Sequence, residues 1–212
     1  MRIGILGAGL MGGKLGTLFA RAGHEVTFSY ARSMDKLERL AKEAGANAHA
    51  GTPAEAAKDA DVILLAVHWS RVDNVLAQAG DLAGKTVVTC SLPMTEDDTA
   101  LVVAHTCSGA EALADKIPDS RIVSAFSTTP SEALFGVFEG KDNAPRPTLV
   151  YCGNDARAKR KVASLISDLG FEPLDVGKLQ SARYIEPFSL LIARIAYEGD
   201  GGPAVSYRIQ RL

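Results

Sequence analysis

The stretch Met1-Arg-Ile-Gly-Ile-Leu-Gly-Ala-Gly-Leu-Met-Gly12 decides the fold of this chain. Residues 2–6 are apolar enough for a short buried strand, and residues 10–22 place apolar side chains at helical spacing. Between strand and helix lie three glycines in the pattern G-x-G-x-x-G, namely Gly7, Gly9 and Gly12. In a strand-turn-helix context this pattern is the dinucleotide-binding fingerprint.

Each glycine has a separate physical task. Gly7 permits a sharp turn off the strand, Gly9 lets the backbone approach a pyrophosphate, and Gly12 lets the helix pack closely on the sheet. The first helical turn, at Leu10 and Met11, has backbone N–H groups without helical partners, and we expect them to bind the diphosphate. The alternative is a glycine-rich turn of an α/β protein that binds no nucleotide.

Composition excludes several classes of function. The 212 residues carry a formal net charge of -2 with a pI near 6.1, so the chain has no basic excess for nucleic acid. No apolar run is long enough to span a bilayer and no signal-peptide pattern is present, so we expect a cytoplasmic protein without a membrane partner. The three cysteines and four histidines form no C-x-x-C or H-x-x-H pair. We therefore expect reduced cysteines without disulfides, and no metal site.

The end of the second predicted strand, residues 24–30, indicates which dinucleotide fits. An NAD site usually has an acidic residue here for the ribose 2′-hydroxyl, whereas an NADP site has an arginine for the 2′-phosphate. This chain reads Ser29-Tyr30-Ala31-Arg32-Ser33, with no acid at the tip. We therefore predict NADP(H), with Arg32 as the phosphate ligand and Ser29, Tyr30 and Ser33 beside it. Alternatively Arg32 only closes a loop, and Ser33 is the N-cap of the next helix.

Further apolar segments, at residues 61–67, 85–90 and 121–126, read as strands buried on both faces. They predict an α/β fold: a Rossmann-type doubly wound, mainly parallel sheet with helices on both faces and a C-terminal helix. We expect one NADP-binding domain over residues 1–212, with 178–212 as a helical extension. The residues after these strands should wall the nicotinamide and its ribose: Ala66, Val67, His68, Ser91, Pro93, Ala125, Phe126 and Ser127.

Helix signals occur elsewhere in the chain. A helix is expected over residues 34–44, and capping boxes at Thr52–Glu55 and Ser108–Glu111 mark two further helix starts. Residues 140–147 read as a loop. The last segment, residues 179–197, reads as one long helix that tolerates Pro187 only as a kink or a break.

Several motifs together carry a family resemblance: Gly7-x-Gly9-x-x-Gly12, Gly23-His-Glu-Val26, Arg32, Asp59-Ala-Asp-Val-Ile63 with Ala66-Val67, Ser108-Gly-Ala-Glu111, Ala125-Phe126 and Ala182-Arg-Tyr-Ile-Glu-Pro187. Over essentially its whole length the chain resembles the short NADP-dependent oxidoreductases typified by F420H2:NADP oxidoreductase, and the related reductase domain of the STEAP metalloreductases. The resemblance implies direct hydride transfer between nicotinamide C4 and a stacked deazaflavin or flavin ring. Coenzyme F420, FMN or FAD would then be the second substrate.

The chain departs from the family pattern on the side that faces the second substrate. Members commonly have Asn-Pro after the fifth strand and Ala-Phe-Asn-Thr after the sixth, whereas this chain has Ser91-Leu-Pro93 and Ala125-Phe-Ser-Thr128. At the tip of the second strand only Arg32 remains of the family's Ser-Arg. These changes leave the cofactor class intact and leave the identity of the acceptor open.

The leading hypothesis is an NADP(H)-dependent oxidoreductase that exchanges a hydride with F420 or a free flavin. The sequence offers no catalytic carboxylate, lysine or nucleophile, so no catalytic residue is assigned. One alternative is reduction of a small carbonyl or imine compound, with His68 or Tyr184 as proton donor. Another is a sensor module that holds NADP(H) without turnover.

The final helix also bears on oligomeric state. Its apolar side chains suggest either a homodimer that buries them or packing on the chain's own sheet. The residues concerned are Ile185, Phe188, Leu191, Ile192 and Ile195.

Overall fold

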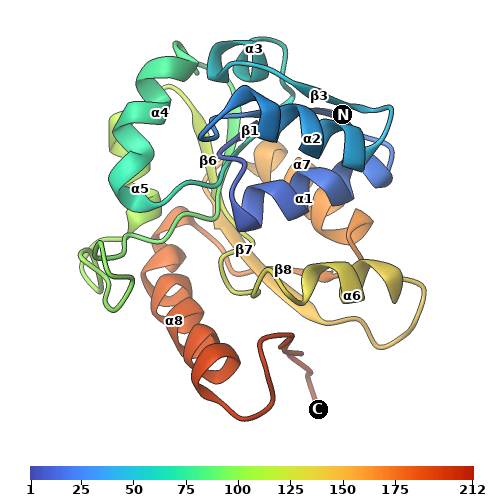
Figure 1. Ribbon diagram of the computed structural model, residues 1–212. Helices are drawn as coiled ribbons and strands as arrows, with labels where there is room; N and C mark the ends of the chain where they lie inside the picture. Colours follow the sequence, from blue (N-terminus) through green and yellow to red (C-terminus); the bar gives the residue numbers. More distant parts are fainter.

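The computed structural model describes residues 1–212 and contains an eight-stranded sheet in the order β3-β2-β1-β4-β5-β6-β7-β8 (Figure 1). The strands are β1 (Arg2–Leu6), β2 (Glu25–Ser29), β3 (Ala48–Ala50), β4 (Val62–Leu65), β5 (Thr86–Thr89), β6 (Arg121–Ser124), β7 (Thr148–Gly153) and β8 (Glu172–Asp175). Neighbours from β3 to β6 are parallel, β7 is antiparallel to β6, and β8 is parallel to β7. The predicted Rossmann-type, mainly parallel sheet is confirmed.

Helices follow most of the strands. They are α1 (Leu10–Arg21), α2 (Met34–Ala44), α3 (Pro53–Lys58), α4 (Val72–Ala79), α5 (Gly109–Lys116), α6 (Leu134–Glu139), α7 (Ala156–Asp168) and α8 (Ala182–Glu198), with short 3-10 turns at Trp69–Arg71 and Leu179–Ser181. The bounds predicted for α2 are confirmed. Helices α4 and α6 were not predicted, because both are short and α6 contains Gly136. Helix α8 runs through Pro187 without a break.

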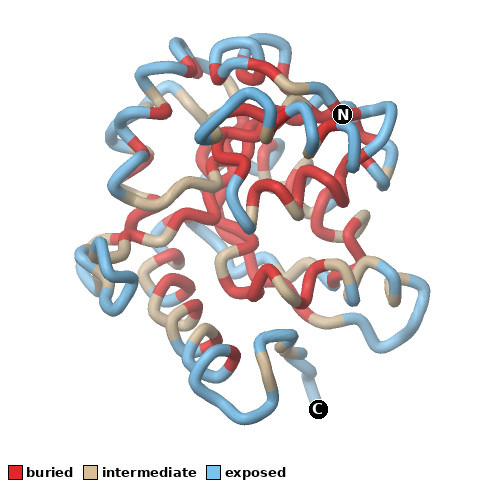
Figure 2. Tube along the Cα trace, in the orientation of Figure 1, coloured by how far each residue is buried: buried red, intermediate tan, exposed pale blue.

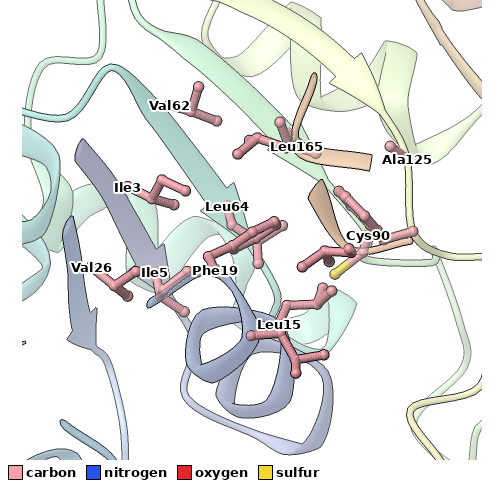
Figure 3. Packing of buried hydrophobic residues seen from close by; sticks show 14 of the residues in the cluster. Ile3, Ile5, Leu15, Phe19, Val26, Val62, Leu64, Cys90, Ala125 and Leu165 are labelled. Atoms are coloured by element: carbon pink, nitrogen blue, oxygen red, sulfur yellow. The ribbon is translucent and has the colours of Figure 1, made fainter. Parts of the chain in front are cut away.

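The two faces of the sheet are covered by different helices. Ile3 and Ile5 of β1 point to the face covered by α1, where they meet Leu15 and Phe19 (Figure 3). Leu6 packs on the opposite face, in a cluster with residues of α3, α4 and α5. Buried segments accordingly run through the centre of the molecule, whereas the outer loops are exposed (Figure 2). The alternation in β1 is that of a strand covered on both sides.

The two predicted capping boxes have different outcomes. Thr52 caps α3 as expected: its hydroxyl accepts from the Glu55 N–H at 3.2 Å, and its own N–H donates to the Glu55 carboxylate at 2.7 Å. At α5 only half of the box forms. Ser108 accepts from the Glu111 N–H at 3.1 Å, but the Glu111 carboxylate accepts from the Ser108 hydroxyl and from Arg183 instead of from the backbone.

The chain after α8 returns to the sheet. The Thr148 N–H donates to the Tyr207 carbonyl at 2.8 Å, and the Tyr207 hydroxyl lies 2.8 Å from the Thr128 hydroxyl. The ring of Tyr207 packs edge-on against that of Phe188, with the ring centroids 5.0 Å apart. The segment 199–212 therefore fastens α8 to the β7 side of the sheet. None of the helices combines the length and apolar character required to cross a bilayer.

Candidate functional site

A pocket of about 1070 Å³ opens at the carboxyl ends of β1, β2, β3 and β4. This edge is where the order of a doubly wound sheet reverses, and it is the place where such folds bind ligands. We call it the nucleotide pocket. Its lining includes Gly7, Ala8, Gly9, Leu10, Tyr30, Ala31, Arg32, Ser33, Met34, Lys36, Leu37, Gly51, Thr52, Pro53, Ala66, Val67, His68, Arg71 and Gln78.

The glycines of the fingerprint differ in what surrounds them. Gly7 has φ of +115°, and a Cβ there would lie 2.6 Å from Val67 Cγ1, so both conformation and space require glycine. At Gly12 a Cβ would overlap the Gly7 carbonyl oxygen, which allows α1 to lie close to β1. Gly9 has no atom within 4 Å of an added Cβ. Its bare backbone is therefore open to the pocket.

The N-terminus of α1 has no side-chain cap and no acidic residue in its first turn. Its first N–H groups, at residues 10–12, have no carbonyl partners within the helix and lie at the rim of the nucleotide pocket. Together with the partial positive charge of the helix end, they form a place for an anion.

The charges around the nucleotide pocket are all positive. Arg32, Lys36 and Arg71 line it, and no carboxylate does. None of the three forms an ion pair within the chain. Arg32 was predicted from the sequence. Lys36 and Arg71 were missed: Lys36 lies one helical turn beyond the strand tip, and only the tertiary fold brings Arg71 from the start of α4 to the same pocket.

Other predicted residues at the rim are already engaged in hydrogen bonds. Tyr30 has φ of +58° and donates through its hydroxyl to Asn74 Oδ1 at 2.7 Å. Ser33 is the N-cap of α2, where its hydroxyl accepts from the Lys36 N–H at 3.4 Å, and it also lines the pocket. Ser33 therefore caps α2, as one prediction had it, and it also lies where it could contact a phosphate.

His68 lines the nucleotide pocket and is held through both ring nitrogens. Nδ1 lies 2.8 Å from Ser70 Oγ, and Nε2 lies 3.3 Å from the Thr95 carbonyl oxygen and 3.2 Å from Asp98 Oδ1. These contacts attach the loop that follows β5 to the rim of the pocket. They fix the imidazole at the nucleotide pocket.

A second pocket of about 240 Å³ continues along the same sheet edge, beneath α8. We call it the α8 pocket. Leu10 lines both pockets, so the two adjoin each other at the start of α1, and we call them together the crevice. The α8 pocket is lined by Leu10, Met11, Cys90, Leu92, Ser127, Thr129, Pro130, Ser131, Ser189, Ile192, Ala193 and Tyr197.

Polar side chains connect the walls of the α8 pocket. The Ser189 hydroxyl of α8 donates to Ser127 Oγ at 3.1 Å, and Lys14 Nζ donates to Ser131 Oγ at 3.0 Å. Tyr197 donates through its hydroxyl to Glu132 Oε2 at 2.9 Å, and burial together with this carboxylate raises the pKa of Tyr197 to about 12.

The thiol of Cys90, in the floor of the α8 pocket, has a pKa raised to about 12 by burial. It remains a neutral thiol at physiological pH and cannot act as a nucleophile there. The chain also contains no group of three or more His, Cys, Asp and Glu side chains placed to hold a metal ion.

Several of the predicted cofactor-binding residues lie outside both pockets. Ser29 is fully buried, and its hydroxyl donates to the Ile5 carbonyl at 2.7 Å, so it cannot supply a donor to a phosphate. Ser91 is buried as well and donates to the Val67 carbonyl at 2.7 Å. Both hydroxyls serve to connect neighbouring strands at the pocket edge.

The other predicted cofactor-binding residues that lie outside both pockets are held by apolar packing. Pro93 packs against Gly109 at the start of α5. Ala125 and Phe126 are buried in the core, where the Phe126 ring lies edge-on to Phe19 with the centroids 6.0 Å apart. Ser127, the next residue, does line the α8 pocket. The predicted strand 121–126 thus extends two residues beyond β6, which ends at Ser124, and of the three residues predicted here only Ser127 faces a pocket.

Two side chains at the α8 pocket, Tyr197 and Lys14, could not be found from the sequence. Tyr197 lies far along the chain from Glu132, and Lys14 from Ser131, so only the folded chain brings each pair together. The structure also places Tyr184, a suggested proton donor, on the outer surface of α8 with 77% of its side chain exposed.

Comparison with known proteins gives consistent results. Residues 2–93 match the family model for coenzyme F420-dependent NADP oxidoreductase. The chain is 30% identical over 155 residues to the F420-dependent NADP reductase of Methanocaldococcus jannaschii, covering 69% of this chain and 68% of that protein. It is 32% identical over 189 residues to rat metalloreductase STEAP3, covering 89% of this chain but 36% of that protein, so it spans about a third of that relative.

A solved structure supports the same assignment over the full length. The crystal structure of a protein of Arthrobacter sp. FB24, provisionally named an F420-dependent NADP reductase, superimposes with a TM-score of 0.86. It shares 25% sequence identity with this chain, and the superposition covers 100% of both chains.

Proposed function

This chain belongs to the family of coenzyme F420-dependent NADP oxidoreductases, and from that premise we propose that it exchanges a hydride between NADP(H) and a flavin-like ring. The ring is that of coenzyme F420 or of a free flavin. The observation that carries the proposal is that a cationic nucleotide pocket adjoins, at Leu10, a small and mostly apolar pocket under α8.

The residues of the nucleotide pocket fit the cofactor. Gly9 leaves room for the pyrophosphate, and the uncapped start of α1 offers N–H groups to it. Arg32, with Lys36 and Arg71 around the same pocket, provides the positive charge that a ribose 2′-phosphate requires. No carboxylate lines the pocket to hold the 2′-hydroxyl of NAD(H) or repel that phosphate.

We assign the nicotinamide and the acceptor to the α8 pocket. NADPH supplies a hydride from its nicotinamide ring, and the protein positions the two rings and excludes water. The volume of about 240 Å³ is below the roughly 300–1,000 Å³ of pockets that enclose a drug-sized ligand. An acceptor ring is therefore only partly enclosed, which suits a substrate that docks, accepts a hydride and leaves.

The test is NADPH oxidation by the purified protein, followed at the nicotinamide absorbance, with F420, FMN, FAD and small carbonyl compounds offered separately. Rapid oxidation with F420 or a flavin supports the proposal and identifies the acceptor. Tight NADPH binding without turnover on any ring compound would refute it and favour a sensor of NADP(H).

A second candidate is reduction of a small carbonyl or imine compound, and one observation favours it. Tyr197 lies at the wall of a pocket small enough for such a substrate, and its hydroxyl, which donates to Glu132, would have to turn from that carboxylate to give a proton to the substrate. It replaces Tyr184 and His68, neither of which lies in the α8 pocket. If the protein reduces a carbonyl compound, and Tyr197→Phe abolishes that turnover while NADPH binding is unchanged, this second function is established.

A further inference from the structure

One carboxylate is buried where two helices meet. Glu186 of α8 is only 2% exposed, and its two oxygens accept from the N–H groups of Gly109 at 2.9 Å and Ala110 at 3.0 Å. These are the first two residues of α5. Ser108 caps the N–H of Glu111, and Glu186, from a helix more than seventy residues further along the chain, accepts from the two N–H groups that precede it.

Glu186 has no cationic partner. No lysine, arginine or histidine lies within ion-pair distance of it. The nearest guanidinium on α8, that of Arg183, is paired through two 2.8 Å hydrogen bonds with the Glu111 carboxylate of α5. The Cys152 thiol of β7 faces Glu186, and because burial raises its pKa to about 12 it stays neutral.

The remaining charged groups around this contact are also paired. Lys159 of α7 and Asp175 of β8 have opposite electrostatic effects on the pKa of Cys152. They form an ion pair of 2.9 Å with each other. Glu132, at the other end of α8, also lacks an ion-pair partner and accepts from the Tyr197 hydroxyl at 2.9 Å. At the contact between α8 and α5, Glu186 has no cationic partner, and its hydrogen bonds come from backbone N–H groups.

This contact bears on the α8 pocket. Ser189 and Ile192 follow Glu186 by one and two turns, and both line the pocket together with Ala193 and Tyr197. The hydrogen bond from Ser189 to Ser127 also depends on how α8 sits on the sheet. The position of Glu186 against α5 thus sets the position of one wall.

A buried carboxylate without a cation makes the docking of α8 sensitive to pH. Burial raises the pKa of Glu186 to about 7, with Glu111 adding to the increase and the two N–H groups opposing it. If α8 moved away from α5, the carboxyl would regain water and its ordinary pKa. The docked helix therefore binds the proton more tightly than the undocked helix, so rising pH weakens docking through the window between those two pKa values.

We propose that Glu186 is a positioning residue of the α8 pocket, and that it makes capture of the acceptor, more than binding of NADP(H), dependent on pH. The inference rests on the proposed function insofar as the α8 pocket receives the acceptor. For a group that titrates near 4.5 when undocked and near 7 when docked, the fraction of undocked α8 rises about tenfold between pH 6 and pH 9.

The experiment compares the wild-type protein with Glu186→Gln and with Glu198→Gln. The latter is a control that removes an exposed acid of the same helix, paired only with Arg194. The KM for the acceptor, kcat and the Kd for NADPH are measured from pH 6 to pH 9. We expect the acceptor KM of the wild type and of Glu198→Gln to rise with pH, the KM of Glu186→Gln to stay flat, and the NADPH Kd to differ less among the three proteins than the acceptor KM does.

Hydrogen exchange of residues 182–198, corrected for intrinsic rates, provides a readout without turnover. Exchange in the wild type should accelerate about tenfold over the same pH range, and exchange in Glu186→Gln should not. Acceleration without any active acceptor would leave the positioning role intact and refute only the proposed function. A flat acceptor KM and flat exchange in the wild type would overturn the inference.

Discussion

Gly9→Ala should separate cofactor binding from folding. Gly9 has φ of -80° and ψ of -156°, which an alanine adopts readily, and its added Cβ meets no atom within 4 Å. The change in the free energy of unfolding should therefore stay within about 0.5 kcal/mol, as for a surface substitution. The methyl group would nevertheless occupy the space through which a pyrophosphate reaches the backbone N–H groups of α1.

The expected loss follows from the hydrogen bonds that would be prevented. One hydrogen bond to a charged group contributes about 1.5–3 kcal/mol, so the Kd for NADPH should rise roughly ten- to a hundredfold. The assay is titration of NADPH by its nicotinamide fluorescence, with thermal unfolding of the same preparation as the measure of stability.

Gly12→Ala is the matched control. Its Cβ would overlap the Gly7 carbonyl oxygen inside the packed turn, so it should lose about 1–3 kcal/mol of stability through overpacking. The reasoning is refuted if Gly9→Ala folds normally and binds NADPH as tightly as the wild type, or if Gly9→Ala unfolds more readily than Gly12→Ala.

Three further outcomes are expected. Arg32→Ala should weaken NADPH by about 2–3 kcal/mol and leave NADH nearly unchanged, and equal losses in binding titrations would remove the 2′-phosphate assignment. We propose that the exposed apolar side chains of Tyr184, Leu191 and Ile195 on α8 bury against a second copy of the chain; sedimentation should then show a dimer that Leu191→Glu dissociates, and a monomeric wild type would contradict this. Lys14→Met should raise the KM for FMN more than that for riboflavin, because it removes a cation beside the α8 pocket, and an equal change would exclude charge recognition by Lys14.

Local sequence signals identified much of the scaffold. The three glycines, the strand that precedes them and the helix 34–44 could be located because turn geometry, capping and apolar periodicity act between residues close in the chain. Arg32 could be proposed as a phosphate ligand because its position follows directly from the second strand. The antiparallel β7 and the helix α4 were not anticipated, since an apolar run carries no information on strand direction.

Predictions for individual rim residues were less accurate, for a geometric reason. The sequence located the ends of β5 and β6 to within two residues, but side chains alternate between the faces of a strand and turns redirect them. Ser91 and Phe126 consequently point into the protein, whereas Cys90 and Ser127 face the crevice.

By itself, the sequence determined the doubly wound fold and the glycine turn after β1, and it placed Arg32 beyond the tip of β2. Only the tertiary structure decided which charges gather around the nucleotide pocket, and that Tyr197 and Ser189 of α8 cover the end of the crevice. It also decided that Glu186, from far along the chain, accepts from the first two N–H groups of α5. The physical reason is that these contacts join residues remote in sequence, whose pairing depends on how helices and strands pack rather than on any local pattern.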